Sequence, residues 1–121
     1  MDSHTQIAYL SAVEIVRTAT YTRNLKRLRK LGAADIDVLA MENAIAANPE
    51  AGALIRGSGG MRKVRFGFGQ SGKSGGGRTI YYVITDEDVV YLITAYAKVD
   101  KEDLTPEEIK LFKVLIEELT Q

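Results

Sequence analysis

The chain has 121 residues, of which 45% are hydrophobic and 26% charged, and it contains no cysteine. This length predicts one domain with a single core, and the composition argues against disorder of the whole chain. The absence of cysteine excludes disulfides and thiolate metal sites, and no run of about 18 apolar residues is present to span a membrane. Because the N-terminus also lacks a secretory pattern, we expect a cytoplasmic protein with no membrane partner.

The formal net charge is zero, but the charges are segregated along the chain. Residues 17–30 contain six cations and no acid, and residues 56–78 contain six more cations without an acid. From residue 86 onward, ten acids stand against four lysines. Such segregation favours a polyanion as the partner of one face, whereas charges that merely decorate solvated surfaces are the alternative.

The N-terminal half predicts one strand and two helices. Residues 1–12 show no clear period and are expected to be a flexible leader, followed by a single domain over residues 13–121. The β-branched run at 13–17 predicts a strand. Residues 18–31 predict a helix that ends at Gly32. Its expected buried stripe is Tyr21, Leu25, Leu28 and Leu31.

A second helix is expected to begin with Asp35 as its capping residue and to stop near Asn48 and Pro49. Its expected buried residues are Ile36, Leu39, Ala40 and Ile45.

The middle of the chain predicts strands. Residues 61–68 alternate, which places Lys63 and Arg65 on one face and Val64, Phe66 and Phe68 on the other. Residues 78–85 are apolar on both faces, as is typical of a central strand. A tight acidic turn at 86–88 then leads to a last strand at 89–98.

The C-terminal helix has the clearest local signal. Thr105 is a capping residue, Pro106 occupies the first helical position and Glu108 completes a capping box. Its buried stripe is expected to be Ile109, Phe112, Ile116 and Leu119. The element order β-α-α-β-β-β-α predicts a small α+β fold with helices packed on an antiparallel-rich sheet.

The glycine-rich basic stretch at 57–82 contains a formal phosphate-loop match, which runs from Gly67 to Gly72, Lys73 and Ser74. A working phosphate loop needs a helix N-terminus directly after it. Three glycines and a β-rich run follow instead, so we do not expect nucleotide hydrolysis. The loop is expected to be a long, flexible hairpin connection with Lys73 at its tip.

The same stretch is a candidate anion site. Lys63 and Arg65 share a strand face, Arg78 opens the neighbouring strand, Lys98 closes the next one, and Lys73 reaches over from the loop. Arginine suits bidentate contact with phosphate. Four tyrosines are candidates for stacking on bases, with core packing as the alternative that we favour for Tyr82 and Tyr91. The four are Tyr81, Tyr82, Tyr91 and Tyr96.

These motifs together resemble the RelE/HigB toxins of bacterial toxin–antitoxin modules. The segments that carry the resemblance are NPEAG at 48–52, GSGGMRKVR at 57–65, GKSGGGRTIYY at 72–82 and YAKVDKEDL at 96–104. The resemblance extends over residues 18–119 and implies a RelE-like fold. It also implies an endoribonuclease that cuts messenger RNA on the ribosome, and a cognate antitoxin, commonly with a helix-turn-helix part.

The resemblance further implies that Lys63, Arg65 and Arg78 hold the scissile phosphate as catalytic residues. The other expected RNA contacts are Arg62, Lys73, Tyr96 and Lys98. Some relatives use a histidine or a C-terminal tyrosine for acid–base work, and no such residue follows Tyr96.

Cleavage without a metal or cofactor can use the 2′-hydroxyl of RNA as the nucleophile, with a base, an acid and cations around the phosphate. His4, the only histidine, is expected to be a solvated bystander. Lys63 is the candidate base, because neighbouring cations would lower its pKa. The acid is left open between Lys98 and Lys73.

Other functions remain as alternatives. A non-catalytic RNA- or ribosome-binding protein would use the same basic sheet, and a regulator that binds duplex DNA is a third class. Asp100, Glu102 and Asp103 raise the idea of a paired-carboxylate hydrolase, although solvated acids before a helix explain them better. No spacing of histidine and acid residues predicts a metal site.

Overall fold

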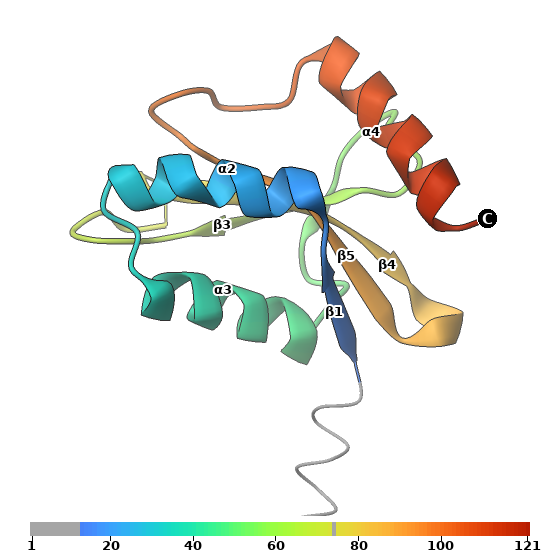
Figure 1. Ribbon diagram of the computed structural model, residues 1–121, viewed down its shortest axis with the longest axis horizontal. Helices are drawn as coiled ribbons and strands as arrows, with labels where there is room; N and C mark the ends of the chain where they lie inside the picture. Colours follow the sequence, from blue (N-terminus) through green and yellow to red (C-terminus); the bar gives the residue numbers. More distant parts are fainter. Residues whose placement is uncertain (1–12, 74) are drawn as a thin grey trace, which may run out of the picture.

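The computed structural model describes residues 13–73 and 75–121 and shows a five-stranded sheet between helices (Figure 1). The strand order is β1-β5-β4-β3-β2. Helices α2 and α3 lie on one face of the sheet and α4 on the other. The expected leader at 1–12, with His4, falls outside the described residues. In the part of the chain that is described, none of the helices is both long and apolar enough to cross a bilayer.

The strands follow the predicted order, with one addition. The elements are β1 (Glu14–Arg17), β2 (Ala53–Leu54), β3 (Arg62–Phe66), β4 (Gly77–Ile84) and β5 (Val89–Ala97). β2 was not predicted, because a two-residue strand shows no alternation of its own. All neighbouring strands run antiparallel except β1, which pairs in parallel with β5. The predicted antiparallel-rich α+β fold is therefore confirmed.

Helix α2 (Ala19–Lys30) forms as its sequence predicts. Thr18 is the N-cap and its hydroxyl accepts a hydrogen bond from the amide of Tyr21. At the other end the chain turns at Gly32, whose φ of 111° lies in the region that favours glycine. Leu31 does not join the buried stripe, because it is the C-cap and remains 36% exposed.

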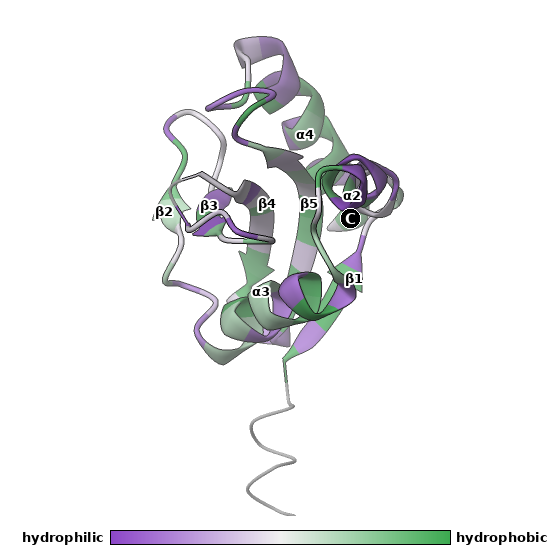
Figure 2. Cartoon of the chain, turned by 90° about the vertical axis from the view of Figure 1, so that its left-hand side faces the viewer, coloured by the Kyte–Doolittle hydropathy of each residue, from purple (hydrophilic) through white to green (hydrophobic). Residues whose placement is uncertain are grey.

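Helix α3 (Asp35–Ala47) shows two errors in the sequence-based expectation. Ala34, not Asp35, is the N-cap, and the Asp37 carboxylate accepts a hydrogen bond from the Ala34 amide at 2.9 Å. The buried residues are Val38, Met41, Glu42 and Ile45, so only Ile45 of the expected stripe is correct. Polar and apolar residues are spread around the helix, which is coloured both purple and green in Figure 2, so the sequence periodicity does not identify its buried side.

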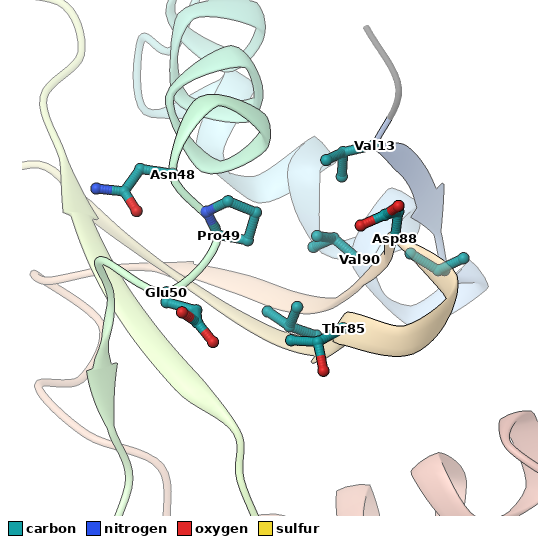
Figure 3. A pocket seen from close by; sticks show the side chains of 9 residues that line it. Val13, Asn48, Pro49, Glu50, Thr85, Asp88 and Val90 are labelled. Atoms are coloured by element: carbon teal, nitrogen blue, oxygen red, sulfur yellow. The ribbon is translucent and has the colours of Figure 1, made fainter. Parts of the chain in front are cut away.

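One end of the sheet contains a pocket of about 240 Å³ between the start of β1, the turn after β4 and the loop after α3 (Figure 3). Its charged lining groups are the carboxylates of Glu50 and Asp88. The turn that borders it is a 3₁₀ segment, Thr85–Glu87, closed by Asp88 in a left-handed conformation with φ 53°. This acidic end of the sheet does not favour an anionic ligand.

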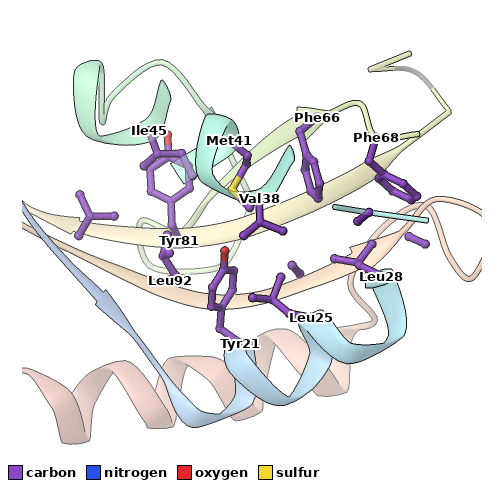
Figure 4. Close-up of a cluster of buried hydrophobic side chains, with 14 residues drawn as sticks. Tyr21, Leu25, Leu28, Val38, Met41, Ile45, Phe66, Phe68, Tyr81 and Leu92 are labelled. Atoms are coloured by element: carbon purple, nitrogen blue, oxygen red, sulfur yellow. The ribbon is translucent and has the colours of Figure 1, made fainter. Parts of the chain in front are cut away.

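The two faces of the sheet carry separate hydrophobic clusters. Side chains of α2, α3, β3, β4 and β5 form the larger one, in which Tyr21, Leu28 and Tyr81 are almost fully buried (Figure 4). Helix α4 (Pro106–Leu119), which has the predicted Thr105 capping box, packs Phe112 and Ile116 on the opposite face. The sheet is thus fixed from both sides, and the ends of β3, β4 and β5 that meet the glycine-rich loop are held in a rigid frame.

Candidate nucleic-acid interface

A row of three side chains crosses the sheet on the face where α4 lies. Arg65 of β3 is the ladder partner of Arg78 on β4, and Arg78 is the partner of Tyr96 on β5. Directly opposed residues point to the same face of a sheet, and Tyr96 packs in the same cluster as Phe112. Lys63 precedes Arg65 by two residues and therefore shares this face. Lys63, Arg65 and Arg78 thus point to one side of adjacent strands.

Arg78 is the most enclosed of these cations, with only 1% of its surface exposed. Its Nη1 donates hydrogen bonds to the carbonyl oxygens of Lys73 at 3.3 Å and Gly77 at 3.1 Å. Its Nη2 lies 3.5 Å from Oε1 of Glu102. A desolvated guanidinium requires such partners. Arg78 consequently links the glycine-rich loop to the chain that follows β5.

Lys63 has a carboxylate as its neighbour. Its Nζ lies 2.5 Å from Oδ1 of Asp103, and its side chain is 22% exposed whereas that of Asp103 is 67% exposed. The expected role of Lys63 as a base depended on neighbouring cations. In this conformation an acid holds its ammonium group instead.

Residues 100–103, which we call the acidic segment, contact cations from three different elements. The three acids are exposed in the turn before α4, as expected, and each of them is also at least one-third exposed while it pairs with a cation. The acids directly follow β5, and β5 lies next to β4, the strand that carries Arg78. This position in the sequence was the signal that could have predicted the contacts. The pairs are Arg27 with Asp100, Arg78 with Glu102 and Lys63 with Asp103.

Tyr96 lies beneath the acidic segment. Its ring is buried, its hydroxyl donates a hydrogen bond to the carbonyl of Glu102 at 3.2 Å, and Nζ of Lys101 lies 4.9 Å from the ring centroid. Burial raises the pKa of Tyr96 to about 12, and the charge of Asp103 acts in the same direction. Lys101 is also bonded to Glu108 of α4. In this conformation the ring packs in the core and does not present a face to a base.

Three expected RNA contacts lie at the rim of this surface. Arg65, Lys73 and Lys98 are exposed. The amide of Lys98 donates a hydrogen bond to the carbonyl of Gly76 at 2.9 Å, which joins the base of the glycine-rich loop to the end of β5. The rim cations therefore come from β3, the glycine-rich loop and the turn directly after β5, around the buried Arg78.

Arg62 does not belong to this group. It alternates with Lys63 and so points to the other face of β3. Its Nη1 donates to the carbonyl oxygens of Glu50 and Gly52, both at 2.7 Å. Arg62 thereby fixes the loop before β2, on the opposite face of β3 from Arg65.

The other three candidate tyrosines, Tyr81, Tyr82 and Tyr91, pack in the hydrophobic core. Tyr81 is 1% exposed and its hydroxyl accepts a hydrogen bond from the amide of Gly52 at 3.0 Å, so the idea that it stacks on bases was wrong. Tyr82 and Tyr91 are partly buried against the cluster under α4, which confirms the core packing favoured for them.

The glycine-rich loop leads directly into β4 at Gly77, and no helix follows it. The rejection of a nucleotide-binding loop is therefore confirmed on the described residues, which omit Ser74. Packing explains two of the glycines. A Cβ at Gly76 would lie 2.2 Å from the carbonyl oxygen of Phe66, and one at Gly77 would lie 2.7 Å from the Phe66 ring.

Comparison with known proteins agrees with this fold. A family profile described as the RelE toxin of the RelE/RelB toxin–antitoxin system matches residues 15–121. Free Escherichia coli RelE, in an arginine-to-alanine double mutant, is 24% identical with a TM-score of 0.51, over 85% of this chain and 95% of that one. A second crystal form of isolated E. coli RelE is 23% identical with a TM-score of 0.49, over 86% and 99% of the two chains. A chain of the toxin–antitoxin complex RelBE2 from Mycobacterium tuberculosis is 16% identical with a TM-score of 0.41, over 71% and 91%.

Proposed function

The chain belongs to the RelE family of toxins from toxin–antitoxin systems, and from this premise we propose that it is an endoribonuclease that cuts messenger RNA on the ribosome. One observation carries the proposal. Lys63, Arg65 and Arg78 point to the same face of neighbouring strands, and Lys73 and Lys98 border that face. Such a cluster suits a phosphodiester, whose charge increases in the transition state of cleavage.

In the proposed reaction the 2′-hydroxyl of RNA attacks the adjacent phosphorus. A base removes the proton of that hydroxyl, the bond to the 5′-oxygen breaks, and an acid protonates the leaving oxygen. The products are a 2′,3′-cyclic phosphate and a free 5′-hydroxyl. Lys63 is the proposed base, Arg65 and Arg78 stabilise the charged phosphate, and Lys73 or Lys98 is the proposed acid. None of these steps calls for a metal or a cofactor.

The acidic segment has to move before this chemistry starts. Glu102 and Asp103 contact Arg78 and Lys63, two of the three proposed catalytic groups. A phosphate would compete with these carboxylates for the same donors, and both acids are at least half exposed and therefore displaceable. We propose that the ribosome supplies the aligned RNA that displaces them, which would limit cleavage by the free protein.

A cognate antitoxin is the proposed protein partner, and a helix-turn-helix part in it is the form that we expect. The family to which the chain belongs supports an antitoxin, because it is defined by toxin–antitoxin pairs. We place the proposed action in the cytoplasm, where ribosomes and messenger RNA are found.

A non-catalytic RNA- or ribosome-binding protein is the second candidate. The pairing of Lys63 with Asp103 favours it, because the carboxylate occupies the amino group that is proposed as the base. Arg65, Lys73 and Lys98 would still hold a phosphate backbone in that case.

Controlled expression tests the proposal. Induction of the wild type should arrest growth and leave cut messenger RNA on ribosomes, and Arg65→Ala should abolish both because it removes an exposed phosphate contact. Lys110→Ala, which removes an exposed cation from α4, is the matched control and should behave as the wild type. Ribosome binding with intact message would instead support the non-catalytic protein. Full cleavage by Arg65→Ala would refute the assigned site.

A further inference from the structure

A hollow of about 240 Å³ lies between α3 and β3, and we call it the α3–β3 hollow. Met41 and Phe66, which are only 4% and 5% exposed, contribute to its lining and are drawn in Figure 4. A concave, mostly apolar site with a few polar groups is typical of the binding sites of flat organic rings. The uncharged lining residues are Ala40, Met41, Ala44, Val64, Phe66 and Gly67.

The hollow is open because β2 covers only the start of β3. β2 pairs with β3 at Arg62 and Lys63, and no described strand lies beside the outer edge of β3 after Lys63. On the side of α3, Ala40 and Ala44 are exposed and line the hollow, where longer side chains would fill it. An uncovered strand edge also presents unpaired backbone donors and acceptors. The hollow can therefore receive a ring that carries polar groups on its rim.

Three charged residues of opposite sign line the same hollow. Arg65 and Lys73 are exposed cations and are also proposed phosphate contacts, whereas Asp37 is a carboxylate. Oδ2 of Asp37 accepts a hydrogen bond from the amide of Ala34 at 2.9 Å. Within the described part of the chain, Oδ1 of Asp37 accepts no hydrogen bond, and neither Arg65 nor Lys73 forms an ion pair with this carboxylate. The hollow thus offers one open acceptor and two cations.

A nucleotide of RNA matches each of these features. The faces of its base are apolar and pack on aromatic and aliphatic side chains, and its phosphate binds arginine and lysine. An aspartate accepts hydrogen bonds from the exocyclic amino group of a base. Adenine, cytosine and guanine carry such a group, whereas uracil has only carbonyl oxygens outside its ring, which a carboxylate repels.

We propose that the α3–β3 hollow binds the base of an RNA nucleotide whose phosphate contacts Arg65 and Lys73, and that Asp37 selects bases with an amino group over uracil. The identification of the ligand as RNA rests on the function proposed above. Met41 and Phe66 belong to the cluster on the α2 and α3 face of the sheet, whereas Arg78 points to the face of α4. The hollow would therefore select a nucleotide beside the scissile phosphate, with Arg65 common to both places.

Titration of the purified chain with nucleoside 5′-monophosphates tests the hollow without any cleavage. Ribose 5-phosphate is the reference ligand, because it carries the phosphate and no base. The monophosphates of adenosine, cytidine and guanosine should bind about fivefold more tightly than uridine monophosphate. In nuclear magnetic resonance spectra they should shift the amide signals of Ala40, Ala44 and Val64. Ribose 5-phosphate should leave these three signals in place.

The variant Asp37→Asn tests the carboxylate. Its amide group can both donate and accept, so the preference over uridine monophosphate should fall to about twofold or less. Asp35→Asn is the matched control, because it removes the same charge from the first turn of α3 at a position outside the hollow. This control should keep the preference of the wild type.

The variant Ala44→Leu tests the space. The added side chain should fill the hollow and weaken binding of every nucleotide to the level of ribose 5-phosphate. Ala47→Leu, at an exposed position of α3 outside the hollow, is its control and should bind nucleotides as the wild type does. Circular dichroism should show the same helix content for both variants.

Cleavage on ribosomes separates this proposal from the proposed function. If the wild type cuts messenger RNA, Asp37→Asn should cut at additional codons that contain uridine, and Asp35→Asn should not. If the wild type cut no RNA but bound the nucleotides with the expected preference, the proposed function would fail while the base site stood.

Three results would overturn the base site. The first is that ribose 5-phosphate binds as tightly as the nucleotides, or that none of these ligands binds. The second is that Asp37→Asn keeps the full preference over uridine monophosphate. The third is that Ala44→Leu binds nucleotides as tightly as the wild type.

Discussion

The ammonium group of Lys63 is held 2.5 Å from the carboxylate of Asp103, across 40 positions of sequence. One residue earlier, Glu102 contacts the buried Arg78. The acids that follow β5 therefore contact two of the cations that the proposed function assigns to phosphate. On that proposal the acidic segment competes with RNA for Lys63 and Arg78, which leads to a prediction of increased activity.

Asp103→Asn should strengthen RNA binding and speed cleavage on ribosomes severalfold. The substitution removes the charge that competes with phosphate and leaves a side chain of similar size. Its effect on the free energy of unfolding should be within about 1 kcal/mol, because the Asp103 carboxylate is mostly exposed. Cleavage rates and urea unfolding of the same preparations measure both quantities.

Asp86→Asn is the control for Asp103→Asn, because Asp86 is exposed in the turn at the other end of the sheet and the change in net charge is the same. Equal stimulation by the two variants would mean that overall charge, not release of Lys63, is responsible.

Arg78→Ala should lose both activity and stability, unlike Arg65→Ala. Arg78 is 1% exposed and bonds the carbonyls of Lys73 and Gly77, so its removal should cost about 3 kcal/mol of unfolding free energy. Arg65 is exposed, and its replacement should change stability by no more than about 0.5 kcal/mol. Urea denaturation measures the difference, and equal stability of the two variants would contradict the structural role of Arg78.

Most of the helices and strands could be predicted from the sequence, because local signals determine where they begin and which way their side chains point. Thr105 and Glu108 mark the start of α4 through side-chain bonds to nearby amides, and the alternation of Lys63 with Val64 assigns the faces of β3. The same alternation is sufficient to place Lys63 and Arg65 on one face of the strand. The antiparallel pairing of β3 with β4 then brings Arg78 beside them.

The features that the sequence did not predict depend on tertiary contacts. The buried side of α3 is selected by the sheet, because polar and apolar residues are not separated onto different faces of this helix. The burial of Arg78 and Tyr96 depends on residues 73 and 102, which reach them from other elements. Sequence spacing does not reveal such contacts, so Tyr96 was expected at the RNA surface although it lies in the core.

Tyr96 should ionise late in an alkaline titration. Burial raises its pKa from 10.0 to about 12, so the folded state favours the neutral phenol. The stability that this contributes is fully present below pH 10 and is lost as the pH rises through 12. Near-ultraviolet absorbance of the phenolate should show a late step that Tyr96→Phe removes. A step that persists in this variant would assign it to another tyrosine, such as Tyr21, whose pKa is also raised by burial.

Two glycines of the basic loop should respond differently to the same substitution. Gly76→Ala places a Cβ 2.2 Å from the carbonyl oxygen of Phe66, so the backbone must shift and stability should fall by about 2 kcal/mol. Gly72→Ala meets no atom within 4 Å and should be neutral or slightly stabilising, by at most about 1 kcal/mol. Thermal unfolding of both variants measures the contrast. The backbone carbonyl of Gly76 accepts a hydrogen bond from the amide of Lys98, so the same backbone shift should displace Lys98 and weaken RNA binding as well. If Gly72→Ala proved the more damaging change, the loop would need glycine for a motion during binding and not for packing against β3.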